Sequence, residues 1–197
     1  MSRIGNQPVP LPQGVAAALG DGVVEITGPL GKLQQRVDDH RLRVLVDETP
    51  PQVRVERTDD QRQTKALHGL TRNLIRNMVV GVTEGYVRGL QVVGVGYSAK
   101  VEGQKLLLQL GYAHPVEVAI PDSVNIDPPE TRSILVTGVG SVPCVTLRIR
   151  GIDKQAVGEF AARVRRLKPP EPYKAKGIRY EGEEVRRKAG KAFAVQE

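Results

Sequence analysis

Cysteine is nearly absent from the 197-residue sequence, and long apolar runs are missing altogether. Cys144 is the only cysteine, so no internal disulfide is possible, which is typical of a reducing compartment. We interpret Cys144 as a half-buried structural thiol, because no neighbouring motif would activate it as a nucleophile. No apolar run approaches the roughly 18 to 20 residues that span a bilayer, and the start MSRIGNQPVP has no signal-peptide core. We therefore expect a cytoplasmic protein.

Motifs for catalysis and metal binding are also scarce. The three histidines, His40, His68 and His114, have no second ligand at helix or hairpin spacing. No G-x-S-x-G elbow and no G-x-x-x-x-G-K-S/T loop occurs. Residues 94–100, GVGYSAK, are rich in glycine and end in lysine, but strand patterns lie on both sides and no helix follows to bind a phosphate. We expect a strand bend or close backbone packing there, and no enzyme activity, metal or cofactor.

Basic residues outnumber acidic ones by 29 to 22, and the excess lies in the last quarter of the chain. Residues 148–191 hold fourteen basic and six acidic residues, a net charge of +8, while all other residues together carry −1. An asymmetry of this size indicates a nucleic acid or an anionic membrane as the partner.

The first half of the sequence predicts strands followed by a helix. Two short strands flank a Gly-Pro turn at 28–31, and residues 41–46 and 52–57 alternate apolar and charged side chains. The period then becomes helical, with Asp59 or Asp60 as the expected cap and Gly81 and Gly85 marking the end. The expected buried stripe is Leu67, Leu70, Leu74 and Met78. The cations expected to point elsewhere are Arg62, Lys65, Arg72 and Arg76.

The second half repeats this plan. A long bent strand is expected at 90–101, followed by strands at 105–110, 116–120, 133–137 and 145–150. Asp153 is expected to cap a second helix, which Pro169 and Pro170 end. Its expected buried stripe is Val157, Phe160, Ala161, Val164 and Leu167.

Strands and then a helix, twice over, indicate an internal duplication. Gly28 matches Gly111 at an offset of 83, whereas VRVERTDDQ from Val53 matches LRIRGIDKQ from Leu147 at an offset of 94. The second copy therefore holds eleven extra residues between 120 and 147, either as a longer connection or as an added hairpin. We predict an α+β protein of two tandem similar domains, each a small antiparallel sheet packed with one main helix. The predicted limits are 1–82 and 83–173, with a basic extension at 174–197.

Residues 168–180, KPPEPYKAKGIRY, combine prolines with cations and tyrosine. Such a run cannot bury enough apolar area to fold on its own, so it needs a rigid scaffold. Guanidinium and ammonium groups bind phosphates, an exposed tyrosine can stack on a base, and Gly177 lets the backbone come close to a partner. The alternative is a solvated linker and tail.

Five stretches carry a resemblance to a known family, namely SRIGNQPV, ALHGLTRNLIRNMVVGVTEGY, LQVVGVGYSAKVEG, GYAHPVEV and GIDKQAVGEFAARVRRLKPPEPYKAKGIRYEGE. They resemble the bacterial form of the sixth ribosomal protein of the large subunit, and PEPYKAKGI at 170–178 looks like the signature of that family. The resemblance implies two similar domains and direct binding to large-subunit rRNA near the sarcin-ricin loop, beside other ribosomal proteins at the stalk base. Two departures are a longer stretch at 127–147 and a less basic end, KAFAVQE.

We expect the C-terminal part of the chain to bind RNA. The candidate RNA-binding residues are Arg163, Arg166, Lys168, Tyr173, Lys174, Lys176, Gly177, Arg179, Tyr180, Arg186, Arg187 and Lys188. Two rival hypotheses are a nucleotide-dependent enzyme that uses residues 94–100 and a peripheral membrane protein that uses the basic tail. We expect neither a small-molecule substrate nor a membrane as the partner. The argument against a membrane is that the tail has prolines instead of an amphipathic stripe.

Overall fold

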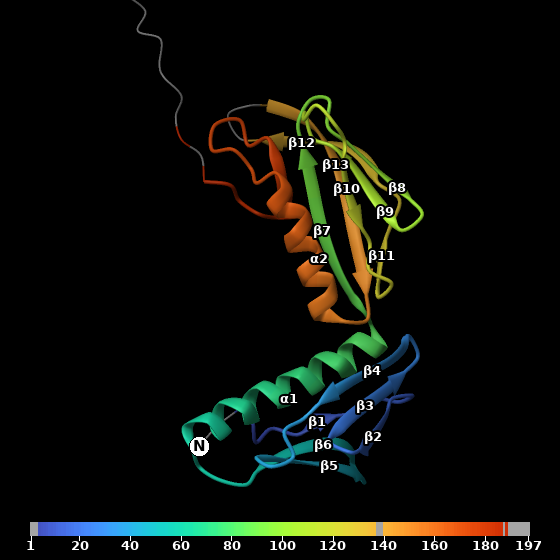
Figure 1. The fold of residues 1–197 in the computed structure, drawn as a ribbon, viewed down its shortest axis with the longest axis vertical. Helices are drawn as coiled ribbons and strands as arrows, with labels where there is room; N and C mark the ends of the chain where they lie inside the picture. The colour runs from blue at the N-terminus through green and yellow to red at the C-terminus, as the bar shows by residue number, and fades with distance from the viewer. Residues whose placement is uncertain (1–3, 137–139, 187, 189–197) are drawn as a thin grey trace, which may run out of the picture. The chain divides into compact units, whose positions relative to one another are not determined.

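The computed structural model describes residues 4–136, 140–186 and 188 (Figure 1). These residues divide into two compact units. Unit 1 holds the residues up to Tyr86 together with Gly151–Lys154, and unit 2 holds Val87–Arg150 together with the described residues from Gln155 on. The domain limits at residues 82 and 173 stay a prediction. Arg187 and the end KAFAVQE lie outside the described residues.

Unit 1 is built from two small antiparallel sheets and one helix. One sheet has the order β1-β6-β5, with β1 (Val9–Pro10), β6 (Pro51–Arg57) and β5 (Leu42–Glu48). The other has the order β2-β3-β4, with β2 (Ala16–Gly20), β3 (Val23–Gly28) and β4 (Gly31–Arg36). Helix α1 (Arg62–Thr83) follows β6, and its apolar residues pack with those of both sheets in one core.

Unit 2 has the same order of strands and helix, with additions. A three-stranded sheet has the order β10-β9-β8, with β8 (Ser98–Glu102), β9 (Lys105–Gln109) and β10 (Val116–Ala119). A five-stranded sheet has the order β11-β13-β7-β14, with β7 (Tyr86–Val93), β11 (Val124–Ile126), β13 (Gly140–Gly151) and β14 (Gly177–Tyr180), and β12 (Glu130–Val136) also pairs with β13. Helix α2 (Lys154–Leu167) follows β13. In both units the first strand pairs with the strand before the helix, β1 with β6 and β7 with β13.

The buried face of α1 differs from the predicted one. Leu70 is 53% exposed, so the prediction that it belongs to the core is wrong. Arg72 was expected to point elsewhere, but it is only 7% exposed. The residues of α1 that are buried are Thr64, His68, Thr71, Arg72, Ile75, Met78, Val79, Gly81 and Val82. The first residues of this face along the helix are polar. A purely apolar stripe therefore fits the leucines beside it better, and the sequence pattern predicted those leucines as core.

Backbone partners explain how α1 can bury polar residues. The Nε2 atom of His68 lies 2.8 Å from the carbonyl oxygen of Val55, which can only accept, so Nε2 carries the proton. Arg72 Nε donates to the carbonyl oxygen of Gln7 at 3.1 Å. Both side chains therefore tie α1 to other segments of unit 1, the N-terminal segment and β6.

The two ends of α1 also differ from the predicted ones. The N-cap is Gln61, which makes no side-chain cap hydrogen bond, and Asp59 Oδ1 accepts from the amide of Gln61 at 3.0 Å instead. Gly81 lies inside the helix, where a Cβ atom would approach the carbonyl oxygen of Ile152 to 2.0 Å. The helix ends at Thr83, and Gly85, with a φ of +75°, turns the chain toward β7.

Residues 90–101 were predicted to form one bent strand, and this prediction is wrong. They are shared between β7 and β8, which belong to different sheets, and residues 94–97 connect them. A Cβ atom on Gly94 would lie 2.8 Å from the ring of Tyr97, so the glycine is needed for close packing. The eleven extra residues of the second half contribute to the antiparallel pair of β12 with β13, in which Glu130 is opposite Thr146. Strand β5 pairs with β6 in the same way in unit 1, so the choice between a longer connection and an added hairpin stays open.

Candidate nucleic-acid interface

Helix α2 buries four of the five residues of the predicted apolar stripe, leaves Leu167 half-buried and exposes cations. Val157, Phe160, Ala161 and Val164 are each at most 3% exposed. Arg163 and Arg166 lie off this stripe, and Arg163 lies 3.6 Å from Glu159 one turn earlier. Helix α2 therefore provides the rigid scaffold that residues 168–180 are expected to need.

Residues 168–180 are part of the core of unit 2, and the linker alternative is wrong. Ala175 is 1% exposed and packs in a cluster with Val93, Val142 and Cys144, and Ile178 is fully buried. Ala175 has a φ of +56°, a conformation that costs a residue with a Cβ about 1 kcal/mol and persists where packing fixes it. Because Ala175 points inward, its neighbour Lys174 is exposed to the solvent.

Strand β14 fixes the end of this segment to the sheet. It pairs antiparallel with β7, with Gly177 opposite Val93 and Tyr180 opposite Leu90. Gly177 has a φ of +136°, and a Cβ atom there would lie 2.6 Å from the carbonyl oxygen of Pro169. We predicted that Gly177 allows close approach to a partner, whereas in this structure the close approach is to the chain itself. The signal for β14 was weak, because the strand has only four residues and comes directly after the charged run.

Lys168 lies half-buried among groups of unit 2. Its ammonium donates to the carbonyl oxygen of Leu110 at 3.0 Å and lies 4.3 Å from the ring centre of Tyr112 and 5.5 Å from that of Tyr97. Tyr112 in turn donates from its hydroxyl to the carbonyl oxygen of Leu167 at 3.1 Å. These contacts give Lys168 a supporting role, and its contact with RNA stays a prediction.

Lys176 is half-buried and lies between two residues that are fully buried, Ala175 and Gly177. Its carbonyl oxygen accepts from the amide of Glu171 at 2.9 Å, which closes the loop that carries Tyr173. The backbone of Lys176 is therefore held in place, and the contact of its ammonium with RNA stays a prediction.

Arg179 and Tyr180 are also held by protein groups. Arg179 Nε donates to Gln91 Oε1 at 3.0 Å on the neighbouring strand. The ring centre of Tyr180 lies near two guanidinium groups, 4.4 Å from that of Arg88 and 5.5 Å from that of Arg165. Both Tyr180 and Arg179 are half-buried, so each leaves only part of its side chain for a partner.

Arg165, which the sequence did not single out, forms an ion pair with Glu183 that closes the end of this region. Its Nε donates to Glu183 Oε2 at 3.1 Å, and the same carboxylate accepts from the amide of Tyr180 at 2.9 Å. The hydrogen bonds from Arg165 lower the pKa of Glu183 and raise that of Arg165. A carboxylate eighteen positions away gave no local spacing by which this pair could be found.

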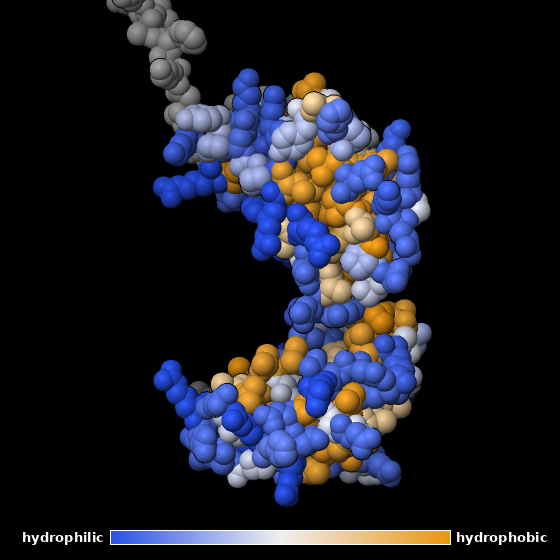
Figure 2. Space-filling model, viewed as in Figure 1, coloured by the Kyte–Doolittle hydropathy of each residue, from blue (hydrophilic) through white to orange (hydrophobic). Residues whose placement is uncertain are grey.

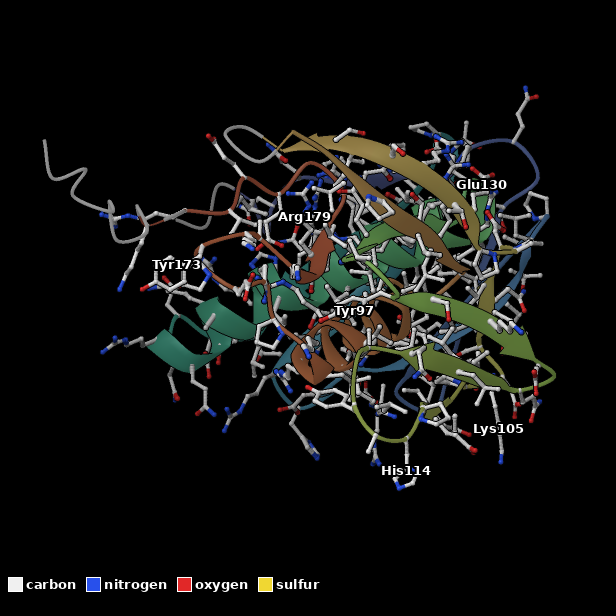
Figure 3. The ribbon with its side chains drawn as sticks, turned by 90° about the horizontal axis from the view of Figure 1, so that it is seen from above. Tyr97, Lys105, His114, Glu130, Tyr173 and Arg179 are labelled. Carbon is white, nitrogen blue, oxygen red and sulfur yellow. The ribbon has the colours of Figure 1, made fainter. Side chains whose placement is uncertain are left out.

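The remaining candidates are exposed on the same part of unit 2. They are Tyr173, which is 52% exposed, and Lys174, Arg186 and Lys188. The amide of Lys188 donates to the carbonyl oxygen of Pro172 at 2.9 Å, so the chain returns to the loop that carries Tyr173. Figure 3 shows Tyr173 on this loop, at the margin of the unit, and Arg179 at β14. In Figure 2, strongly hydrophilic residues cover α2 and this segment.

The chemistry of this surface suits a polyanion. Exposed ammonium and guanidinium groups are spread over α2, residues 174–186 and Lys188, and the buried Ala175 and Ile178 hold the backbone around Lys174 in place. Cys144 is 1% exposed, more buried than expected, and burial raises the pKa of its thiol, so it is a packing residue. Within the described part of the chain, no group of three or more His, Cys, Asp or Glu side chains could hold a metal ion.

Residues 94–100 do not form a phosphate-binding loop. Strand β8 follows them, and Tyr97 packs on Gly94 and Gly111. In the described residues, neither helix is long and apolar enough to cross a membrane.

Comparison with known sequences decides the family. The model of the ribosomal protein L6 family matches residues 11–85, 93–140 and 141–181. The chain belongs to the ribosomal protein L6 family. It is similar to the large ribosomal subunit protein uL6 of Roseiflexus castenholzii, with 49% identity over 193 residues and 98% of both chains. The uL6 protein of Dictyoglomus turgidum is 46% identical over 98% of both chains, and that of Thermomicrobium roseum 49% identical over 97% of this chain and 96% of its own.

Membership in this family accounts for the basic surface of unit 2 better than a catalytic role does. The L6 family consists of ribosomal proteins and is structural, so the protein is not an enzyme.

Proposed function

We propose that this protein is a cytoplasmic structural constituent of the large ribosomal subunit that binds 23S rRNA directly through α2 and residues 168–188. The observation that carries this proposal is the pattern at 174–178, in which Ala175 and Ile178 are buried while Lys174 is exposed. Burial holds the backbone in place, so the cations lose little conformational freedom when they bind phosphates.

The position within the subunit rests on the family resemblance. We infer that the protein binds near the sarcin-ricin loop and the base of the factor-binding stalk, contacts neighbouring ribosomal proteins there, and supports subunit assembly and translation. The full-length similarity to uL6 proteins supports this position.

We also infer that the two units arose by internal duplication. In each unit a three-stranded meander is combined with a sheet in which the first strand pairs with the strand before the helix. The L6 model matches one stretch in unit 1 and two stretches within the second half of the chain. Strand β14 and the greater length of β13, which has 12 residues against 7 in β6, would then be later additions to the second copy.

Salt dependence of binding tests the RNA surface. We expect the variant Lys174→Gln, Arg186→Gln, Lys188→Gln to bind a 23S rRNA transcript more weakly than the unmodified protein. Its plot of log affinity against log salt should be flatter by about two units, because each neutralised phosphate contributes roughly 0.7 to 0.9. Stability should be unchanged, since all three residues are exposed.

A matched control removes the same charge from strands of unit 2. Lys100, Lys105 and Arg132 lie on β8, β9 and β12, and their replacement by Gln should leave the slope unchanged. If both triple variants flatten the slope equally, only net charge attracts RNA and the proposed surface is incorrect.

A further inference from the structure

The exposed face of α1 in unit 1 is a second basic surface, which the total charge of the chain conceals. The cations of this helix are Arg62, Lys65, Arg72 and Arg76, and it has no acidic residue over 22 positions. Residues 1–61 before it hold nine acidic and seven basic residues. Charge in unit 1 is therefore separated, with the positive part concentrated on the helix.

This arrangement is unfavourable for the free helix. Arg62 and Lys65 lie in the first turn, where the helix dipole favours acidic side chains, and no acidic residue is present there. Arg72 and Arg76 are four positions apart, a spacing at which like charges repel. Burial lowers the pKa of Arg72, and the charge of Arg76 lowers it further. A partner that neutralises these charges would remove the repulsion.

Two of these cations, Arg62 and Arg76, lie in a line along the exposed side of α1. At 3.6 residues per turn, Arg62 and Arg76 fall within about 40° of each other around the axis and about 21 Å apart along it. Asn73 lies between them on the same stripe and is exposed, as Arg62 and Arg76 are. Lys65 lies at the edge of the stripe, with its ammonium 3.9 Å from Asp60. Ala66 and Gly69 between the cations are small, so a partner can come close to the helix backbone.

An RNA backbone fits this face better than a protein does. Helix α1 has no Trp, Tyr or Phe, so it lacks both the aromatic anchors that are common at protein interfaces and the rings that stack on bases. Cations and the amide of Asn73 instead match phosphate and ribose oxygens. Figure 2 shows strongly hydrophilic residues next to apolar ones along α1, and the exposed apolar residue Leu70 lies on the flank of the stripe.

We propose that the stripe of Arg62, Lys65, Asn73 and Arg76 on α1 binds the phosphate backbone of large-subunit rRNA, so that each unit of the protein has its own RNA contact. This inference extends the proposed function, because it takes the same class of partner to a second surface. Contact with the backbone alone makes this surface independent of base sequence. Two linked contacts also raise affinity beyond that of either one, because the second binding event is intramolecular.

Neutralising the stripe tests the proposal. The full chain carrying Arg62→Gln, Lys65→Gln and Arg76→Gln should bind a 23S rRNA transcript with a log–log salt slope flatter by about two units. Its melting temperature should be unchanged or higher, because the repulsion within the helix is removed. The matched control is Lys32→Gln, Arg36→Gln, Arg43→Gln, which removes the same charge from β4 and β5 of unit 1 and should keep the slope of the unmodified protein.

Comparison with the Lys174, Arg186, Lys188 variant separates this inference from the proposed function. If only the C-terminal variant flattens the slope, the α1 surface is refuted and the proposed function stands. If only the α1 variant does so, the C-terminal surface is refuted and the α1 surface stands. If neither does, both are refuted.

Photo-crosslinking identifies the class of partner. A photo-reactive residue in place of Asn73 should crosslink to rRNA in reconstituted large subunits, and one in place of Gln34, which is exposed on β4, should crosslink less. Crosslinks from position 73 to a ribosomal protein, with none to rRNA, would overturn the proposal.

Discussion

Units 1 and 2 share an order of strands and helix, and they differ most in the segment that leaves the helix. After α1, Gly85 turns the chain at once into β7. After α2, residues 168–176 cross the end of the unit and β14 joins the sheet beside β7. The helices differ too, because α1 buries His68 and Arg72, whereas the buried face of α2 is apolar. One arrangement of strands therefore supports two basic surfaces, one on the exposed face of α1 and one built on the additional segment.

The largest expected effect contrasts the cores beneath the two helices. Phe160→Ala should lower the free energy of unfolding of unit 2 by about 3 to 5 kcal/mol, because Phe160 is 1% exposed and its loss leaves a cavity. Leu70→Ala should change stability by less than about 0.5 kcal/mol, because Leu70 is 53% exposed. Urea denaturation of both variants measures the difference, and equal losses would contradict the assignment of the buried face of α1.

The next effect concerns the two glycines that follow the helices. Gly85 and Gly177 both have positive φ, +75° and +136°, but only at Gly177 would a Cβ atom lie within 3.0 Å of backbone atoms. Gly85→Ala should cost about 1 to 2 kcal/mol from strain alone. Gly177→Ala should cost more and should increase the hydrogen exchange of the Ile178 amide, which donates to the carbonyl oxygen of Lys168 at 2.7 Å. Exchange at Ile178 that stays as slow as in the unmodified protein would show that β14 tolerates a side chain there.

A smaller effect separates supporting cations from RNA-binding ones. Lys168→Met keeps most of the side chain but loses the hydrogen bond to Leu110 and the ring contacts, so stability should fall by about 1 to 2 kcal/mol. Lys174→Met removes an exposed charge and should change stability by less than about 0.5 kcal/mol while weakening RNA binding. Thermal melts and RNA titrations of both variants decide between the roles. Weaker RNA binding by Lys168→Met at full stability would make Lys168 a direct RNA contact.

The smallest effect is acid dependence of unit 2. Because hydrogen bonds from Arg165 lower the pKa of Glu183, the ion pair stabilises the fold above the unfolded-state pKa of about 4.3, and this contribution is lost as the pH falls through the lower folded value. Glu183→Gln should therefore be less stable than the unmodified protein at pH 7 and equally stable near pH 3. Glu159→Gln, at an exposed pair with Arg163, is the control and should show no such convergence. A pH-independent deficit of Glu183→Gln would mean that packing, and not charge, is lost.

Periodicity predicted the parts of the fold that bury apolar residues in a regular pattern. The stripe of α2 was correct except for the half-buried Leu167, because Val157, Phe160 and Val164 are apolar and evenly spaced. The stripe of α1 was wrong because His68 and Arg72 each donate a hydrogen bond to a backbone oxygen that no local pattern reveals. Strand β14 was missed for a similar reason, since its pairing with β7 joins segments far apart in the sequence.

The candidate site was predicted from charge and from the family resemblance. The sequence did not show which of its cations donate to protein oxygens and which are exposed. The sequence grouped Lys168, Lys174 and Arg179 as equivalent cations. In the structure Lys168 and Arg179 donate to protein oxygens, while Lys174 is exposed. Which cation is held by the protein depends on the positions of Leu110 and Gln91, and those positions follow from the tertiary fold alone.

The pairing of β14 with β7 also sets an order of events during synthesis. Gly177 pairs with Val93, eighty-four positions earlier, whereas the closing pair of unit 1 joins Val9 to Val53. Unit 1 can therefore complete its sheets while the second half of the chain is still being made, because domains fold as units from the N-terminus. Unit 2 has a sheet that lacks one edge strand until almost the whole chain has left the ribosome. The proposed RNA-binding segment is thus the last part to be placed, so a truncated chain cannot present a finished C-terminal surface to rRNA.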